Sequence, residues 1–186
     1  MKKHILLLLT LLILLPGLTA CHKDPECKVC VAYFSYSGVT KAVAETLAQV
    51  TDATLYEIVP EEAYGDDTMN YNDENARAYR EQMGTAPQRP AIKKTLEGAE
   101  KYDVLLLGFP VWYGKAPRVI LSFLEAYSFD GKTVIPFCTS DSSTIDSSET
   151  ELKTTFPAIN WRHGDRLNGK TAVQLQAWYE SFGCGL

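Results

Sequence analysis

Histidine is scarce in this sequence, with three in 186 residues, at positions 4, 22 and 163. His163 alone falls in the expected folded domain, where its polar neighbours predict a place on the surface. The glycine-containing stretch 35–40, which follows the first apolar run of that domain, matches neither a Walker A loop nor a Gly-x-Gly-x-x-Gly turn. The few histidines argue against a histidine-based metal centre, and residues 35–40 are not one of the two commonest glycine-rich nucleotide-binding loops.

An excess of positive charge is also missing, because the formal net charge is −5. Loss of Lys2 and Lys3 with a cleaved leader would change that charge to −7. An acidic chain is a poor ligand for nucleic acid, and it does not bind anionic lipid by charge. No repeat, low-complexity tract or linker interrupts the mature chain of about 165 residues, which predicts a single domain.

The first twenty residues have the pattern of an export signal. Lys2 and Lys3 precede the apolar run Ile5–Leu15, which is too short to span a bilayer, and Pro16-Gly17 follows. Residues 1–20 are therefore predicted to be a signal peptide that is absent from the folded domain.

Small residues before a cysteine, in Leu18-Thr19-Ala20-Cys21, match a bacterial lipobox. An ordinary signal peptide or an uncleaved anchor would be the alternatives. We expect lipidation at Cys21, a tether over residues 21–27 and a folded domain over 28–186. The protein would then be an exported lipoprotein that meets the membrane only through its N-terminal lipid.

The first expected strand starts at Cys30 and runs into Ser-x-Ser-Gly-x-Thr, directly before a helical pattern. The free amides of a first helical turn, hydroxyls from Ser35, Ser37 and Thr40, and the small Gly38 would together form a phosphate cradle. A Ser/Thr-rich turn that only caps the helix is the alternative.

Strand and helix patterns alternate along the remaining chain, which predicts an α/β fold with a doubly wound, five-stranded parallel sheet. Later strands are expected over 54–60, 103–110, 132–140 and 158–161, with helices over 70–83, 118–127, 149–156 and 170–182. In the strand order 2-1-3-4-5, the loops after the first, third and fourth strands adjoin, and ligands bind at such a switch point.

Two of these loops carry further signals of a ligand. Pro110–Gly114 contains Trp112 and Tyr113, which could stack on a planar ligand, although either could pack onto the following helix instead. The loop after the fourth strand, residues 139–144, is rich in hydroxyl groups.

The chain resembles the flavodoxin family from Lys28 to Phe182. The resemblance rests on Ser-Tyr-Ser-Gly-Val-Thr at 35–40, Gly-Phe-Pro-Val-Trp-Tyr-Gly at 108–114 and Gly-Lys-Thr-Val-Ile-Pro-Phe-Cys-Thr-Ser at 131–140. It implies an FMN cofactor whose phosphate is held by the loop after the first strand. That loop consists of Ser35, Tyr36, Ser37, Gly38, Val39 and Thr40.

The resemblance also implies positions around the flavin ring. Trp112 or Tyr113 would cover one face of the ring, within a loop formed by Pro110, Val111, Trp112, Tyr113 and Gly114. Thr139, Ser140 and Asp141 would lie along the ring edge, and Tyr64 would lie near the ribityl chain.

The third loop departs from the family pattern, which places glycines after Thr139-Ser140. Here the sequence continues Asp141-Ser142-Ser143-Thr144-Ile145-Asp146. Fewer glycines mean fewer conformations with positive φ, and flavin could bind differently or more weakly as a result. Asp141 would oppose reduction of the flavin to an anion and so lower its potential, or it would cap the helix that follows.

The resemblance implies electron transfer by a membrane-tethered flavoprotein, with a redox protein or a quinone as partner. One alternative is an NAD(P)H-dependent quinone or nitro reductase on the same fold. Another is a non-redox lipoprotein that binds a ligand or a partner at a degenerate flavin site. Yellow colour in purified protein would favour the redox functions, and NADH oxidation would indicate the enzyme.

The cysteines lead to a testable pairing. Cys21 is assigned to lipid, and Cys30 and Cys138 lie in apolar strand runs. Cys27 and Cys184 remain near the two ends of the domain, where the last helix should return to the start of the first strand. We predict a Cys27–Cys184 disulfide that stabilises the domain by about 2–5 kcal/mol.

Mass spectrometry of alkylated, non-reduced protein measures this directly. The expected result is a linked peptide pair, whereas two alkylated thiols at these positions would rule the disulfide out.

Overall fold

All pairings between the named strands of the sheet are parallel, and their order is the one predicted. The computed structural model describes residues 27–86, 88–93 and 96–183. Neighbouring strands follow the order β2-β1-β3-β4-β5, which confirms the doubly wound α/β architecture. The strands are β1 Val29–Tyr33, β2 Thr54–Glu57, β3 Val104–Pro110, β4 Thr133–Thr139, β5 Asn160–Trp161 and β6 Asp165–Arg166.

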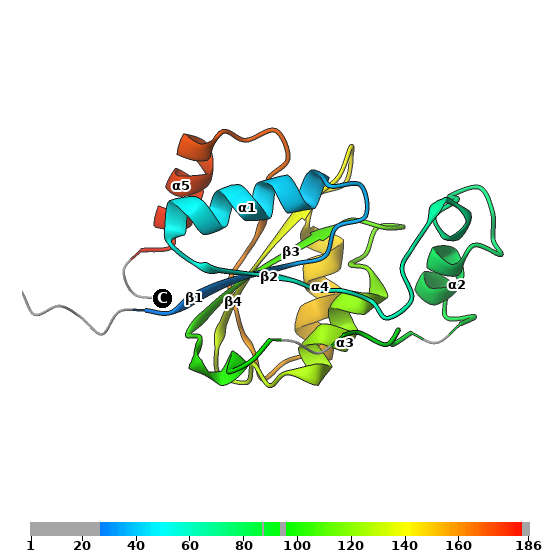
Figure 1. The fold of residues 1–186 in the computed structure, drawn as a ribbon, viewed down its shortest axis with the longest axis horizontal. Coiled ribbons are helices and arrows are strands. Elements are labelled where there is room, and N and C mark those ends of the chain that lie inside the picture. The colour runs from blue at the N-terminus through cyan, green and yellow to red at the C-terminus, as the bar shows by residue number, and fades with distance from the viewer. Residues whose placement is uncertain (1–26, 87, 94–95, 184–186) are drawn as a thin grey trace, which may run out of the picture.

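The two central strands, β3 and β4, are buried on both faces because helices cover each side of the sheet (Figure 1). Successive side chains of a strand point to opposite faces. Leu105 and Leu107 therefore join the apolar cluster that includes Val119 of α3, while Leu106 joins the cluster that includes Leu47 of α1. This double burial explains why β3 and β4 are near-continuous apolar runs.

Helices α1 and α5 cover one face of the sheet, and α3 and α4 cover the other (Figure 1). The helices are α1 Val39–Thr51, α2 Arg77–Met83, α3 Arg118–Ala126, α4 Asp146–Thr155 and α5 Ala172–Glu180, with 3₁₀ turns η1 Asp66–Thr68 and η2 Ala99–Lys101. The last helix is shorter than the predicted range 170–182, because the Thr171 hydroxyl caps it by accepting a hydrogen bond from the Gln174 amide at 3.3 Å.

The segment between β2 and β3 forms a lobe beyond the end of the sheet, and α2 lies within it (Figure 1). Sequence patterning predicted a helix over 70–83, but the described helix begins only at Arg77. The residues before it form turns in which Asn70 and Asp73 accept hydrogen bonds from the amides of Asn72 and Asn75. Such local side-chain bonds compete with helix formation, so the prediction was too long at its start.

Buried polar contacts attach this lobe to the sheet. The Gln82 side chain of α2 donates to the Ala116 carbonyl at 3.0 Å. The guanidinium of Arg118, which is 4% exposed, donates to the Gln82 carbonyl at 3.4 Å and pairs with Glu151 at 2.9 Å. The lobe is therefore anchored to α3, next to the loop that follows β3.

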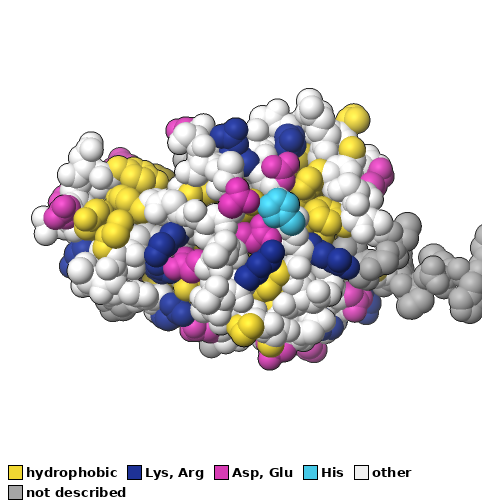
Figure 2. All heavy atoms as spheres, turned by 180° about the vertical axis from the view of Figure 1, so that it is seen from behind, with side chains coloured by type: hydrophobic (Ala, Val, Ile, Leu, Met, Phe, Trp, Pro, Cys, Tyr) yellow, Lys and Arg dark blue, Asp and Glu magenta, His cyan; other side chains and the backbone are white. Residues whose placement is uncertain are grey.

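The expected fifth strand, 158–161, is present in shorter form as β5 at Asn160–Trp161, and a further short strand that was not predicted, β6, also pairs with β4. Between β5 and β6, Gly164 passes so close to β4 that an added Cβ would lie 1.9 Å from the Pro136 carbonyl oxygen. Buried Glu149 holds this crossing, because its Oε2 accepts from the Gly164 amide at 3.4 Å and contacts His163 Nδ1 at 2.8 Å. The His163 side chain is 72% exposed, as predicted, and Figure 2 shows a histidine among acidic and basic side chains on this face.

Several predicted features lie outside the described residues. They are the signal peptide 1–20, the lipidation site Cys21, most of the tether and Cys184. Within the described ranges, no helix is long and apolar enough to cross a bilayer. The same ranges hold no group of three or more His, Cys, Asp or Glu side chains arranged around a metal ion.

The Gly164 crossing generates a stability prediction. Gly164→Ala should lower the free energy of unfolding by about 2–3 kcal/mol, because backbone atoms of Pro136 cannot move away from a methyl group. Gly65→Ala is the matched control, since its Cβ would meet nothing within 4 Å and its φ is −129°. Urea denaturation should show a near-native control, and equal losses in both variants would contradict this packing.

Candidate functional site

The loops after β1, β3 and β4 meet around one cavity of about 510 Å³ at the carboxyl ends of the strands. Most of the predicted site residues line it: Tyr36, Ser37, Val39, Pro110, Val111, Trp112, Tyr113, Gly114, Thr139, Ser140 and Asp141. Ser35, Gly38, Thr40 and Tyr64 lie outside its lining. The convergence expected from the strand order is therefore present in the structure.

The α1 N-terminus forms one end of this site. Gly38 is the N-cap residue, its φ of +87° is a left-handed conformation that favours glycine, and its amide donates to Ser35 Oγ at 3.1 Å. No side chain caps the helix and no acidic residue lies in its first turn. The first helical amides have no intrahelical acceptor, so this end of the cavity favours an anion.

A buried hydrogen bond joins the first loop to the third. The hydroxyl oxygens of Thr40 and Thr139 lie 2.8 Å apart, and the two residues are 1% and 5% exposed. The Thr40 hydroxyl, predicted to face phosphate, is thus engaged within the protein. The polar group that Thr40 has at the helix terminus is its backbone amide.

The aromatic loop after β3 is a tight turn. Tyr113 and Gly114 have φ values of +51° and +76°, and the amide and carbonyl groups of Trp112 and Lys115 exchange hydrogen bonds at 2.9 and 3.0 Å. Positive φ at both central residues is typical of a type I′ turn. Although both aromatic side chains line the cavity, Trp112 is only 3% exposed and belongs to the core, while Tyr113 is half-buried.

Tyr64 lies behind Trp112 instead of in the cavity. The two ring centroids are 4.9 Å apart, and the Tyr64 hydroxyl donates to Glu81 Oε2 at 2.5 Å. Burial, followed by the contact with Glu81, raises the pKa of Tyr64. The Arg77 guanidinium lies 4.4 Å above the Tyr64 ring and pairs with Glu81 at 2.6 Å.

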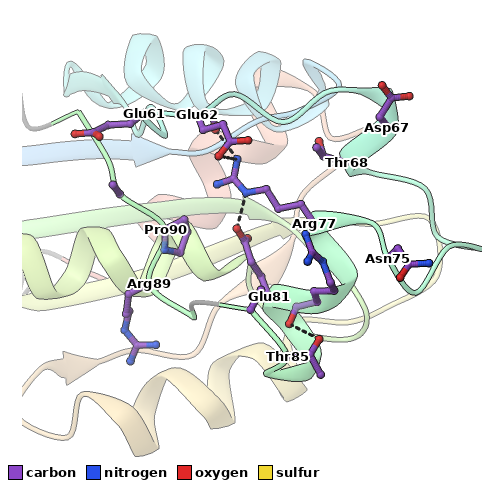
Figure 3. A pocket seen from close by; sticks show the side chains of 13 residues that line it. Glu61, Glu62, Asp67, Thr68, Asn75, Arg77, Glu81, Thr85, Arg89 and Pro90 are labelled. Carbon is purple, nitrogen blue, oxygen red and sulfur yellow. Dashed lines mark hydrogen bonds and ion pairs between the residues drawn. The ribbon is translucent and has the colours of Figure 1, made fainter.

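This buried group borders a second cavity of about 640 Å³, shown in Figure 3. In that view Arg77 and Glu81 point toward each other, and Glu62 approaches the same guanidinium. Because the charges of Arg77 and Glu81 neutralise one another, their function in the described structure is to hold the lobe together.

Five lining residues were not among the predicted site residues: Ser142 and Ser143, from the third loop, and Met69, Tyr71 and Asn168, which lie outside the three loops. Tyr71 comes from the lobe, is 53% exposed and places its ring 4.8 Å from that of Tyr113. Figure 2 shows hydrophobic side chains gathered over this lobe. Tyr71 lies among polar residues in the range that was predicted as a surface helix, so no sequence signal connected it with the cavity.

The third loop adopts its conformation without glycine. Among the described residues, only Asp52 and Tyr113 have a positive φ apart from glycines, so residues 139–146 carry no such strain. Asp141 is the one charged residue that lines the cavity. Its carboxylate makes none of the hydrogen bonds found at the start of α4, where Thr144 instead donates to Asp146 at 2.7 Å.

The buried cysteines offer no thiol chemistry at neutral pH. Cys30 and Cys138 are fully buried, and burial raises the pKa of each thiol to about 12. Both cysteines are core residues, as their positions in apolar strand runs predicted. Cys27 is exposed, and the described cysteines form no disulfide with one another. Because Cys184 lies outside the described residues, its pairing with Cys27 stays a prediction.

Taken together, the site offers amides for an anion at one end, an aromatic wall and a hydroxyl-rich edge. No activated nucleophile lies among the described lining residues. Such a site can bind and orient a planar anionic ligand.

Comparison with known proteins identifies relatives of the chain. Residues 28–182 match the model of a flavodoxin family. No curated protein matches the chain. A candidate flavoprotein from Bacteroides eggerthii is 40% identical with a TM-score of 0.78, and the match covers 83% of this chain and 96% of that one. A similar protein from Bacteroides uniformis is 40% identical with a TM-score of 0.79, covering 83% and 98%.

A more distant similarity is to a flavoprotein from Lactobacillus acidophilus, which was solved in complex with FMN. It is 22% identical, has a TM-score of 0.61, and the match covers 82% of this chain and 99% of that one. At this identity the similarity supports the fold alone.

The Thr40–Thr139 contact generates a double-mutant prediction. Thr40→Val or Thr139→Val alone should destabilise the cofactor-free protein by about 1–3 kcal/mol, because each leaves a buried hydroxyl without its partner. The double variant should lose less than the sum of the two single losses. Urea unfolding of the four proteins measures the coupling, and strict additivity would show that the two hydroxyls do not depend on each other.

Proposed function

The chain belongs to the flavodoxin family, and from that premise we propose that it binds FMN and carries electrons at a membrane surface. The observation that supports FMN binding best is the single cavity that joins an uncapped helix N-terminus to an aromatic wall. FMN has matching parts, since it combines a phosphate with a planar ring system.

The residues present fit the phosphate. Backbone amides at the start of α1 would hold it, helped by the Ser37 hydroxyl, while the conformation of Gly38 directs the chain around it. Because no Lys or Arg lines the cavity, these amides and the helix dipole supply the positive potential. The absence of an acidic residue in the first turn of α1 favours the same ligand.

The residues present also fit the flavin ring. Tyr113 offers an aromatic face from the turn after β3, while Trp112 lines the same cavity from within the core. Thr139, Ser140 and Asp141 line the polar edge. When bound, FMN supplies one- and two-electron redox chemistry, and the protein contributes binding, orientation and electrostatic tuning.

Electron transfer by a bound flavin requires little chemistry from the side chains of the protein. The cysteine thiols of β1 and β4 are buried and protonated, and His163 contacts Glu149 on the α4 side of the molecule. Neither feature contributes to the cavity. The role of this chain is therefore to hold the cofactor and to keep part of it accessible to a redox protein or a quinone.

We further propose that the domain is exported and tethered by lipid on Cys21. The signal-like pattern of residues 1–20 and the lipobox at 18–21 support this part of the proposal. With an acidic domain, contact with an anionic bilayer would depend on the lipid and not on charge attraction.

Purified protein should be yellow and bind FMN more tightly than riboflavin, which lacks the phosphate. Ser37→Ala should weaken FMN binding by about 1–2 kcal/mol, roughly a five- to thirtyfold rise in Kd, and leave riboflavin binding nearly unchanged. Quenching of flavin fluorescence measures both constants.

Ser122→Ala is the control, since its hydroxyl donates within α3 to the Arg118 carbonyl and does not line the cavity. Equal losses for FMN and riboflavin in Ser37→Ala would show that this loop does not hold phosphate. Failure of the wild-type protein to bind either flavin would contradict the proposed function itself.

A further inference from the structure

We propose that Arg166 and Asn168 are positioning residues that hold the glycine-poor loop 140–143 along the flavin edge. This inference rests on the proposed FMN binding. It concerns residues 166–168, at the end of β6 and directly after it, which were not among the predicted site residues.

Both backbone groups of Ser140 contact this segment. The Ser140 amide donates to Asn168 Oδ1 at 3.3 Å, and the Ser140 carbonyl accepts from the Arg166 guanidinium at 3.4 Å. The same guanidinium nitrogen donates to the Asp141 carbonyl at 3.2 Å. These three hydrogen bonds, termed here the brace, connect two consecutive loop residues to one short strand.

The brace begins where the pairing between β4 and β6 ends. The last registered partners of β4 and β6 are Cys138 and Arg166, and the Leu167 amide then donates to the Cys138 carbonyl at 2.9 Å. β4 itself ends at Thr139, and beyond it the side chains of Arg166 and Asn168 continue the contact with the loop.

Strand periodicity explains why these two residues act together. Residues two apart in an extended segment project to the same side, and the residue between them projects to the other. Leu167 is fully buried in the cluster that includes Phe137 and Leu175. The buried leucine anchors the segment, so its two polar neighbours are held toward the loop.

The loop depends on such support because it has few other bonds. Ser143 donates from its amide to Ser140 Oγ at 2.9 Å, which closes a short turn. Asp141 and Ser142 are exposed. The loop contains no glycine that would permit a tight turn. Its position above the sheet is therefore fixed by contacts from outside the loop.

The brace also affects the electrostatics of the cavity. Asp141 is its one charged lining residue, and Asn168 lines the same cavity. The Arg166 guanidinium donates to the backbone carbonyl of Asp141, so a positive charge lies at the same loop residue that carries this carboxylate. Arg166 therefore offsets part of the field that opposes reduction of a bound flavin.

Residues 160–162, which come shortly before the brace residues in the chain, offer matched controls. Asn160 donates to Thr133 Oγ1 at 3.3 Å at the start of β4, far along the strand from the cavity. Arg162 is exposed and lies between β5 and β6. Asn160→Ala and Arg162→Ala thus remove the same side-chain types from the same segment without touching loop 140–143.

The first test uses cofactor-free protein. Hydrogen exchange of the loop amides, of Ser140 above all, should be faster in Asn168→Ala and Arg166→Ala and unchanged in both controls. Unchanged exchange in the two brace variants would overturn the proposal whether or not the protein binds flavin.

The second test uses bound flavin. Asn168→Ala and Arg166→Ala should raise the Kd for FMN and for riboflavin by similar factors, about three- to tenfold, because the loop contacts the ring and not the phosphate. A loss confined to FMN, or wild-type affinity for both flavins, would overturn the proposal.

The midpoint potential separates positioning from general stability. Arg166→Gln should shift the potential of bound flavin to a more negative value, more strongly at low salt, while Arg166→Lys restores it. An unshifted potential in Arg166→Gln would overturn the electrostatic part. Loss of flavin binding by the wild-type protein would count against the proposed function, and hydrogen exchange would still decide whether these residues hold the loop.

Discussion

The parallel pairing of β3 between β1 and β4 is the constraint on which the rest of the structure depends. Gly108 pairs with Tyr33 on one side and Phe137 on the other, and the Phe34 amide then donates to the Gly108 carbonyl at 2.9 Å. The absence of a side chain at Gly108 leaves room for the Phe137 ring, because an added Cβ would lie 2.2 Å from Phe137 Cζ. Since the three strands end at the same edge, the loops that leave them have to share one cavity.

Around this fixed edge, the site is shaped by elements that are remote in sequence. The lobe between β2 and β3 contributes Tyr71 to the cavity and packs its Arg77–Glu81 pair against Tyr64, whose ring contacts Trp112. The segment directly after β6, on the opposite side, contributes Asn168. Both supporting elements are anchored by buried groups, Gln82 on α2 and Glu149 on α4, so cofactor binding and domain stability depend on some of the same contacts.

The side chains that line the cavity do not supply the positive charge that a proposed phosphate site would need. The cavity lining contains a carboxylate and no basic side chain, so attraction for an anion comes from the amides of α1. The nearest guanidinium described at this edge, that of Arg166, contacts carbonyl oxygens of the loop. A membrane-tethered flavodoxin-like protein built in this way would bind FMN through backbone geometry, and would tune its potential through a few exposed charges.

The sequence by itself determined the strands and the three loops of the site, because buried strands and hydroxyl-rich loop residues leave local patterns that need no partner to be recognised. The strand order was expected from the topology of doubly wound sheets. Tertiary structure alone decided which of Trp112 and Tyr113 enters the core, that the Thr40 hydroxyl faces Thr139, and that Tyr71 and Asn168 reach the cavity. It also placed the unpredicted strand β6 beside β4, directly after Gly164, where the chain meets Pro136. Each of these outcomes depends on contacts between residues far apart in the chain, and local periodicity carries no information about such contacts.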